Sequence, residues 1–114
     1  MTEVSRLTVN ELAAMNGMAA VALPEGEREI DGVYIGDLLS WVMGRAKADN
    51  AWITIMSNIN IVAVASLADV ACIILAEGVA LDETVVETAK AKGVNIISSQ
   101  MPAYETAMLI GEKL

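Results

Sequence analysis

The sequence contains no histidine and no phenylalanine, one cysteine, two prolines, and seven lysines and arginines against fifteen aspartates and glutamates. Without histidine the chain lacks the commonest general base, so it cannot build a Ser–His or Cys–His pair or an imidazole metal site. The formal charge of −8 disfavours nucleic acid and anionic membrane surfaces as partners, because both are negatively charged. Composition therefore excludes several chemistries without pointing to a function.

The single cysteine, Cys72, lies in the apolar run 70–75. A reactive thiol needs an electropositive and partly open setting, which an apolar strand does not supply. We therefore expect a buried, inert thiol in a chain suited to the reducing cytoplasm.

The polar first residues do not resemble a signal peptide. The stretch 50–76 has polar interruptions that argue against a membrane-spanning helix.

Length and hydropathy together predict one globular domain. The chain has 114 residues, of which 55% are apolar and 19% charged. Such a composition is the opposite of a disordered acidic tail and is typical of a folded domain with a large core. Because no linker or low-complexity segment is visible, we expect a single domain over residues 1–114.

The first third of the chain predicts a helix and a small hairpin-like element. Thr8 and Glu11 have the spacing of a capping box, which predicts a helix over 9–16. Turn chemistry at 24–27 separates two apolar runs that we interpret as strands, 18–23 and 30–35.

The remaining two thirds alternate between helix and strand. Asp37 is expected to cap the helix 38–46, and Asp82 to cap another helix that ends at Gly93. The other expected elements are strands at 51–56, 71–75 and 94–97 and helices at 61–67 and 102–113. Strands about 20 residues apart with helices between them predict right-handed crossovers and a parallel sheet. The expected fold is therefore α/β, a mainly parallel sheet of four to five strands with helices on both faces.

Three segments, 53–63, 71–78 and 93–99, resemble a DRTGG domain, with an architecture similar to the N-terminal, non-kinase domain of HPr kinase/phosphorylase. The resemblance covers residues 30–114 well. The motifs that name the family are altered. The family has Gly-Asp-Arg where this chain has Met56-Ser57-Asn58, and Thr-Gly-Gly where it has Ala76-Glu77-Gly78.

The resemblance implies an accessory or regulatory module rather than an enzyme. Domains of this kind accompany CBS, phosphotransacetylase and phosphatase domains. A kinase would need a phosphate-binding loop, and the pattern G-x-x-x-x-G-K-[ST] does not occur in the sequence. We expect no catalytic residues, no cofactor and no metal.

The expected ligand site lies where parallel strands end, because open α/β sheets bind ligands beyond the carboxyl ends of their strands. A small polar or anionic metabolite is the expected ligand. The alternative interpretation is that the asparagines and serines there only cap helices. The candidate ligand residues are Thr54, Ser57, Asn58, Asn60, Glu77, Gly78, Ser98 and Ser99, with Gln100 beside them.

Other acidic residues have plainer interpretations. Glu25, Glu27, Glu29 and Asp31 alternate around a turn, where a solvated acidic hairpin is preferred over a Ca²⁺ site, because the EF-hand pattern is missing. Asp69 is unusual, because it is a carboxylate near the end of a helix.

A homodimer is the expected assembly. The segment 61–67 is apolar on every side, and a small domain has difficulty covering such a helix. The expected interface residues are Trp41, Ile61 and Val64. Two other functions remain open: a structural subunit of a metabolic enzyme complex, and a phosphotransfer-related enzyme using Ser57, Ser98 or Ser99.

Overall fold

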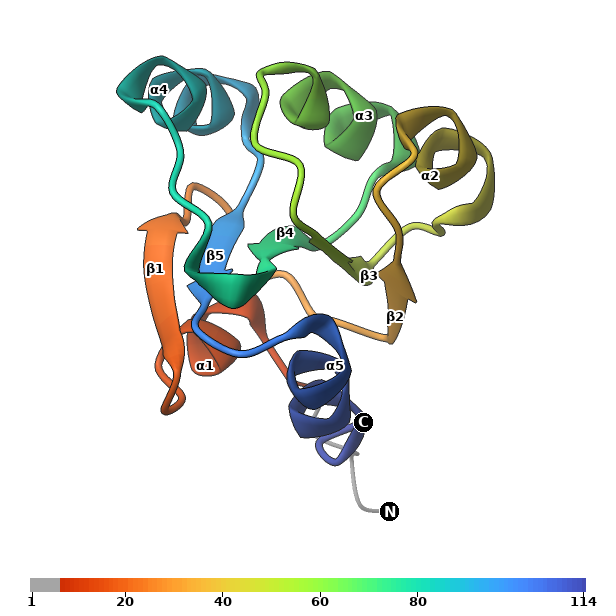
Figure 1. Ribbon diagram of the computed structural model, residues 1–114, viewed down its shortest axis with the longest axis vertical. Coiled ribbons are helices and arrows are strands. Elements are labelled where there is room, and N and C mark those ends of the chain that lie inside the picture. The colour runs from red at the N-terminus through yellow and green to blue at the C-terminus, as the bar shows by residue number, and fades with distance from the viewer. Residues whose placement is uncertain (1–6) are drawn as a thin grey trace.

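The computed structural model describes residues 7–114 (Figure 1). The first six residues, which contribute to the expectation about a leader, lie outside the described residues. Along the chain the elements are α1 (Val9–Ala13), β1 (Met18–Ala22), β2 (Gly32–Ile35), α2 (Leu39–Arg45), β3 (Asn50–Thr54), α3 (Asn60–Ala68), β4 (Cys72–Leu75), the 3-10 turn η1 (Ala76–Gly78), α4 (Glu83–Lys92), β5 (Ile96–Ser99) and α5 (Ala103–Gly111).

The strands form one five-stranded sheet in the order β1-β5-β4-β3-β2. Strands β2, β3, β4 and β5 are parallel, and β1 pairs with β5 in the antiparallel direction. Helices α2, α3 and α4 cover one face of the sheet, and α1 and α5 cover the other (Figure 1). The predicted α/β class, the mainly parallel sheet and the flanking helices are confirmed.

The predicted hairpin is wrong. β1 and β2 do not pair but form the two opposite edges of the sheet. The segment between them crosses the amino ends of the other strands instead of turning back. Local turn chemistry at residues 24–27 suggested a hairpin, but β1 pairs with a strand from the far end of the chain, with Met18 opposite Ser99.

Several helix ends agree with the sequence. Thr8 and Glu11 form the complete capping box of α1, and Gly93 adopts a left-handed conformation (φ 71°) that ends α4. Two expectations are wrong. Asp37 is not the cap of α2, whose N-cap is Leu38, and Pro102 is the N-cap of α5 rather than its first helical residue.

The core has one layer on each face of the sheet. Toward α2, α3 and α4, Trp52 and Ile73 are fully buried, and the Trp52 indole donates a 2.9 Å hydrogen bond to the carbonyl of Gly36. Toward α1 and α5, Ile53 and Ile74 are fully buried. Because consecutive strand residues point to opposite faces, the continuous apolar strands supply both layers.

Candidate functional site

Polar loops from neighbouring strands meet at one edge of the sheet. The register sets Thr54 beside Leu75, and Leu75 beside Ser98, so β3, β4 and β5 end at the same level. The loops that follow therefore lie next to one another, as the sequence predicted. We call this region the strand-end site. It comprises residues 54–60, 76–78 and 98–101.

Thr54 and Asp37 shape the exit from β3. The Thr54 hydroxyl is buried and donates a 2.8 Å hydrogen bond to Oδ1 of Asp37, which also accepts one of 3.0 Å from the amide of Ile55. The same hydroxyl accepts from the amide of Met56 at 3.2 Å. Asp37 therefore holds the loop after β3 in place, a role that sequence reasoning missed because its partners are far away along the chain.

The loop after β3 carries exposed polar side chains. Ser57, Asn58 and Asn60 are all exposed. Oδ1 of Asn58 accepts a 2.9 Å hydrogen bond from the amide of Asn60, and its carbonyl accepts one of 3.2 Å from the amide of Ile61. Asn58 thus forms a side-chain turn just before α3, whose N-cap is Ile59 and has no side-chain cap hydrogen bond, so the alternative interpretation, helix capping by this asparagine, is wrong in that form. The Ser57 hydroxyl and the Asn58 amide nitrogen are placed to contact a ligand, and that role stays a prediction.

The turn after β4 has an unusual backbone. Glu77 and Gly78 both have positive φ, 62° and 69°. Glu77 stands where the stated resemblance places a glycine, and its conformation is one that glycine adopts most readily. Its amide donates a 2.9 Å hydrogen bond to the carbonyl of Met101, and a Cβ on Gly78 would lie 3.2 Å from the side chain of Gln100. The turn is thereby tied to the loop after β5.

The two serines of β5 differ in access. Ser98 is half-buried, whereas Ser99 is fully buried, with its hydroxyl 2.8 Å from that of Thr106. The Ser99 oxygen also accepts a hydrogen bond from the amide of Met101. Ser99 is brought to the strand-end site, but its hydroxyl points inward and positions the start of α5. Of this pair, Ser98 is the one that reaches the surface.

The electrostatics of the strand-end site are mixed. The carboxylates of Asp37 and Glu77 are exposed there, and the amino-terminal ends of α3 and α5 also lie there. Helix amino termini favour negative charge, whereas the carboxylates oppose it. Within residues 7–114 no hydrogen bond joins the Ser57 or Ser98 hydroxyl to a carboxylate, so neither serine has the activating base that a nucleophile needs.

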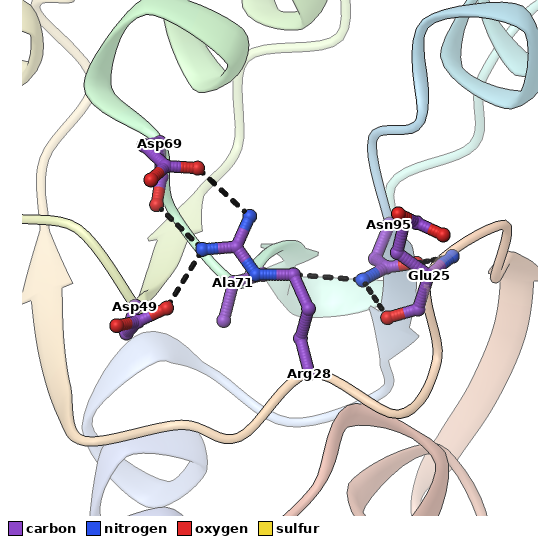
Figure 2. A network of polar contacts seen from close by, with 6 residues as sticks. All are labelled: Glu25, Arg28, Asp49, Asp69, Ala71 and Asn95. Carbon is purple, nitrogen blue, oxygen red and sulfur yellow. Dashed lines mark hydrogen bonds and ion pairs between the residues drawn. The ribbon is translucent and has the colours of Figure 1, made fainter.

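A second polar network lies at the opposite edge, where the strands begin (Figure 2). The Arg28 guanidinium donates hydrogen bonds to the carboxylate of Asp49 (2.8 Å) and to the carboxylate (3.0 Å) and carbonyl (2.9 Å) of Asp69. Partial burial lowers the pKa of Arg28, but these two carboxylates outweigh it and raise the pKa above its ordinary value. The network explains Asp69, the carboxylate that the sequence left without a partner.

We call this network of Arg28 with Asp49 and Asp69 the clamp. Asn95 extends the clamp from a buried position. Its Oδ1 accepts a 2.9 Å hydrogen bond from the amide of Glu25, and its Nδ2 donates to the carbonyls of Glu25 (2.8 Å) and Ala71 (2.9 Å) (Figure 2). Arg28 and Asn95 together fasten the segment that crosses from β1 to β2. Sequence reasoning missed both residues. Within residues 7–114 no group of three or more acidic or cysteine side chains is placed to hold a metal ion.

The expected interface residues fall in two different environments. Trp41 is 52% exposed, with the Arg45 guanidinium 3.7 Å from the centre of its ring. Ile61 and Val64 are buried within the chain itself, so the structure corrects their expected place on the surface. The sheet and the neighbouring helices cover that side of α3, and its outer side carries Ala63, Ser66 and Leu67.

Cys72 is fully buried, and that burial raises the pKa of its thiol to about 12. The predicted burial of this residue is confirmed. Across the described part of the chain, no helix has the length and apolar character needed to cross a membrane.

The chain is similar in fold to a solved structure, the CBS and DRTGG domains of the regulatory region of Clostridium perfringens pyrophosphatase complexed with the activator diadenosine tetraphosphate. The TM-score is 0.71 at 14% identity, and the alignment covers 100% of this chain and 52% of that chain. This chain therefore spans about half the length of its structural neighbour. The comparison with curated proteins gives no match. The DRTGG domain model matches residues 11–112, nearly the whole sequence, and the chain belongs to the DRTGG domain family.

Proposed function

We propose that this DRTGG domain is a non-catalytic regulatory module of the cytoplasm that binds a small polar or anionic metabolite at the strand-end site and acts through protein contacts. One observation carries the proposal. The positions of the two altered family motifs, Ser57-Asn58 and Glu77-Gly78, follow adjacent strands and lie on one exposed edge. The regulatory region of the pyrophosphatase, about half of which this chain matches in fold, is complexed with the activator diadenosine tetraphosphate, which supports a ligand of that general kind.

The site is built to couple the two faces of the sheet. The loop after β3 leads into α3 on one face, and the loop after β5 leads into α5 on the other (Figure 1). The hydrogen bond from Glu77 to Met101 joins the turn after β4 to the start of α5. A ligand that bridges Ser57 and Glu77 would bias the relative position of α3 and α5. The size of that effect is set by the difference in its affinity for the two arrangements.

A thermal-shift screen tests ligand binding. The panel contains diadenosine tetraphosphate, mononucleotides, acetyl-CoA, acyl phosphates and inorganic anions. A ligand at 100 times its dissociation constant stabilises the native state by about 2.7 kcal/mol, which raises Tm by several degrees in a domain of this size. We expect at least one compound to produce such a shift.

Matched variants locate the site. Ser57→Ala removes an exposed hydroxyl, and Asn58→Asp keeps the oxygen that accepts the Asn60 amide while removing the side-chain amide donor. Both are expected to abolish the shift. Ser66→Ala, an exposed serine on α3 outside the site, is expected to retain it. A shift that survives both site variants would place the ligand elsewhere, and a panel without a shift would contradict ligand sensing.

Two other functions make different predictions. A phosphotransfer enzyme would move phosphate from labelled ATP to HPr or to a serine of this chain, and we expect no transfer because neither surface serine is paired with a base. A structural subunit would purify from native extract with a partner enzyme at fixed stoichiometry and would show no ligand response. The screen therefore separates a sensor from both alternatives.

A further inference from the structure

The two edges of the sheet differ in what surrounds them. Within residues 7–114, α1, β1 and α4 carry no exposed large apolar side chain. By contrast, the elements around β2 carry several. Ile35 ends β2 and is 51% exposed, Leu38 and Trp41 lie at the start and middle of α2, and Tyr104 and Met108 lie on α5, which packs against β2 and β3. Because α2 and α5 cover opposite faces of the sheet, these exposed apolar side chains flank the β2 edge from both faces, and exposed apolar groups of this kind favour an interaction surface.

The two edge strands also differ in how well they are protected against pairing with a further strand. β1 has an irregularity in its pairing between Ala20 and Ala22, and Pro24 follows it, and both features discourage a further strand. β2 is regular over Gly32–Ile35 and contains no proline or lysine. Its outer side carries unpaired backbone groups, as any edge strand does, and β2 has no residue of the kind that prevents a further strand from pairing there.

The exposed side of α2 carries opposite charges at its two ends. Leu38, Trp41 and Arg45 lie three and four residues apart and so share one side of the helix. The exposed carboxylate of Asp37 precedes this stripe and Arg45 ends it. Arg45 rests over the ring of Trp41, which keeps its charge on the stripe. In a chain with a charge of −8, a cation amid exposed apolar side chains offsets the repulsion of an acidic partner.

We propose that a second copy of this chain docks on the β2 edge, about a two-fold axis that pairs the two β2 strands in antiparallel fashion. The same axis lays the α2 helices side by side in opposite directions. Arg45 of one copy then meets Asp37 of the partner subunit, and the contact repeats on the other side, as a two-fold interface requires. The ten-stranded sheet that results buries Trp41 at the centre of the α2 pair.

This proposal deepens the proposed function, because it names the protein contact through which the module acts. Asp37 belongs to both surfaces. Its Oδ1 fixes Thr54 and Ile55 at the strand-end site, and its carboxylate faces the partner's Arg45 in the proposed dimer. Asp37 therefore links the loop that contacts a ligand at the strand-end site with the proposed interface. Dimer affinity is the quantity that the ligand would change.

Sedimentation velocity on the full chain, across the micromolar range, tests the interface. We expect the wild type to dimerise. Ile35→Lys places a charge on the open edge, and Arg45→Glu sets like charges against Asp37 of the partner subunit. Each should raise the dissociation constant tenfold or more, the size of effect seen for central interface residues. The two positions are exposed, so both variants should keep their circular dichroism and serve as independent readouts.

Leu67→Lys is the matched control. Leu67 is 72% exposed on α3 and lines a separate groove of about 500 Å³ between α3 and α4. We expect this variant to dimerise like the wild type. A monomeric wild type would overturn the proposal, and so would loss of the dimer in Leu67→Lys with retention in Ile35→Lys and Arg45→Glu. Retention of the ligand-induced thermal shift in a monomeric variant would leave the ligand site standing, so the two proposals fail separately.

Discussion

Arg28 binds Asp69 twice, through a 3.0 Å contact with its carboxylate and a 2.9 Å hydrogen bond to its carbonyl. Asp69 is the left-handed C-cap of α3 (φ 57°). Arg28 therefore donates to a free backbone carbonyl at the helix end and also neutralises a carboxylate that the helix dipole disfavours at that end. The same guanidinium binds Asp49, another residue with positive φ. The clamp joins the segment before β2 to the residues that precede β3 and β4.

Arg28→Ala should therefore destabilise the protein by about 2 kcal/mol, since it removes a charged network and a bond to a backbone carbonyl. Part of the loss should shrink at high salt, because the carboxylates are partly exposed and screened. Urea unfolding at low and high salt measures both effects. Lys113→Ala is the control, because Lys113 is exposed and forms no ion pair within the described residues. An equal loss in both variants would contradict the clamp.

Asn95→Ala should cost about 3 kcal/mol. Asn95 is 2% exposed and makes three hydrogen bonds to the backbone of Glu25 and Ala71, and its removal leaves those groups unsatisfied in the interior. Asn95→Asp should cost more, because a carboxylate would face two carbonyl oxygens. Chemical denaturation gives both values. Asn16→Ala, in an exposed turn, should change stability by less than about 0.5 kcal/mol.

Glu77→Gly should stabilise the protein by about 1 kcal/mol. Glu77 has a φ of 62°, a conformation that costs an ordinary residue roughly this amount and glycine almost nothing. Glu77→Ala keeps the Cβ and should give no such gain, which separates backbone strain from loss of the carboxylate. Thermal unfolding of the wild type, Glu77→Gly and Glu77→Ala distinguishes the two causes. A gain in Glu77→Ala equal to that in Glu77→Gly would show that charge, not conformation, is responsible.

Cys72 should make the protein lose stability at alkaline pH. Burial raises the pKa of its thiol from 9.0 to about 12, so the folded state keeps a proton that the unfolded chain releases above pH 9. Stability is therefore full below pH 9 and falls by up to about 1.4 kcal/mol per pH unit between pH 9 and 12. Because lysines and tyrosines also titrate there, the measurement is the difference from Cys72→Ala, which should show a shallower decline.

The native thiol should also resist modification. A disulfide reagent at pH 8 should react with Cys72 only in denaturant, since the side chain has no exposed surface. Rapid labelling of the folded protein would contradict this environment.

The sequence predicted what is local or periodic. The capping box of Thr8 and Glu11 and the alternation of strands and helices from residue 51 were readable because neighbouring residues specify them. The edge where the strands end followed from the same parallel order. Which residues would gather there was therefore predictable, whereas the inward direction of the Ser99 hydroxyl was not, because Thr106 arrives from another element.

The contacts that the sequence did not predict share a physical cause. Asp37 was assigned to the nearest helix, but its hydrogen bonds go to Thr54 and Ile55, which only the folded sheet brings close. Arg28 and Asp69 lie 41 residues apart, so nothing in either neighbourhood indicates the other. The burial of Ile61 within its own chain likewise depends on how the flanking helices pack. Each of these contacts is set by tertiary structure, which overrides local preference.

The pairing of β1 with β5 has a consequence for the order in which this chain folds. Met18 must find Ser99, so the first strand of the sheet along the chain pairs with the last one. Closing so long a loop is slow, because its entropy is lost before any contact forms in return. During synthesis the parallel units β2 to β4 can assemble as they emerge, while β1 waits for β5. We therefore expect α1 and β1, but not β2, to lock into the native state only after β5 has formed.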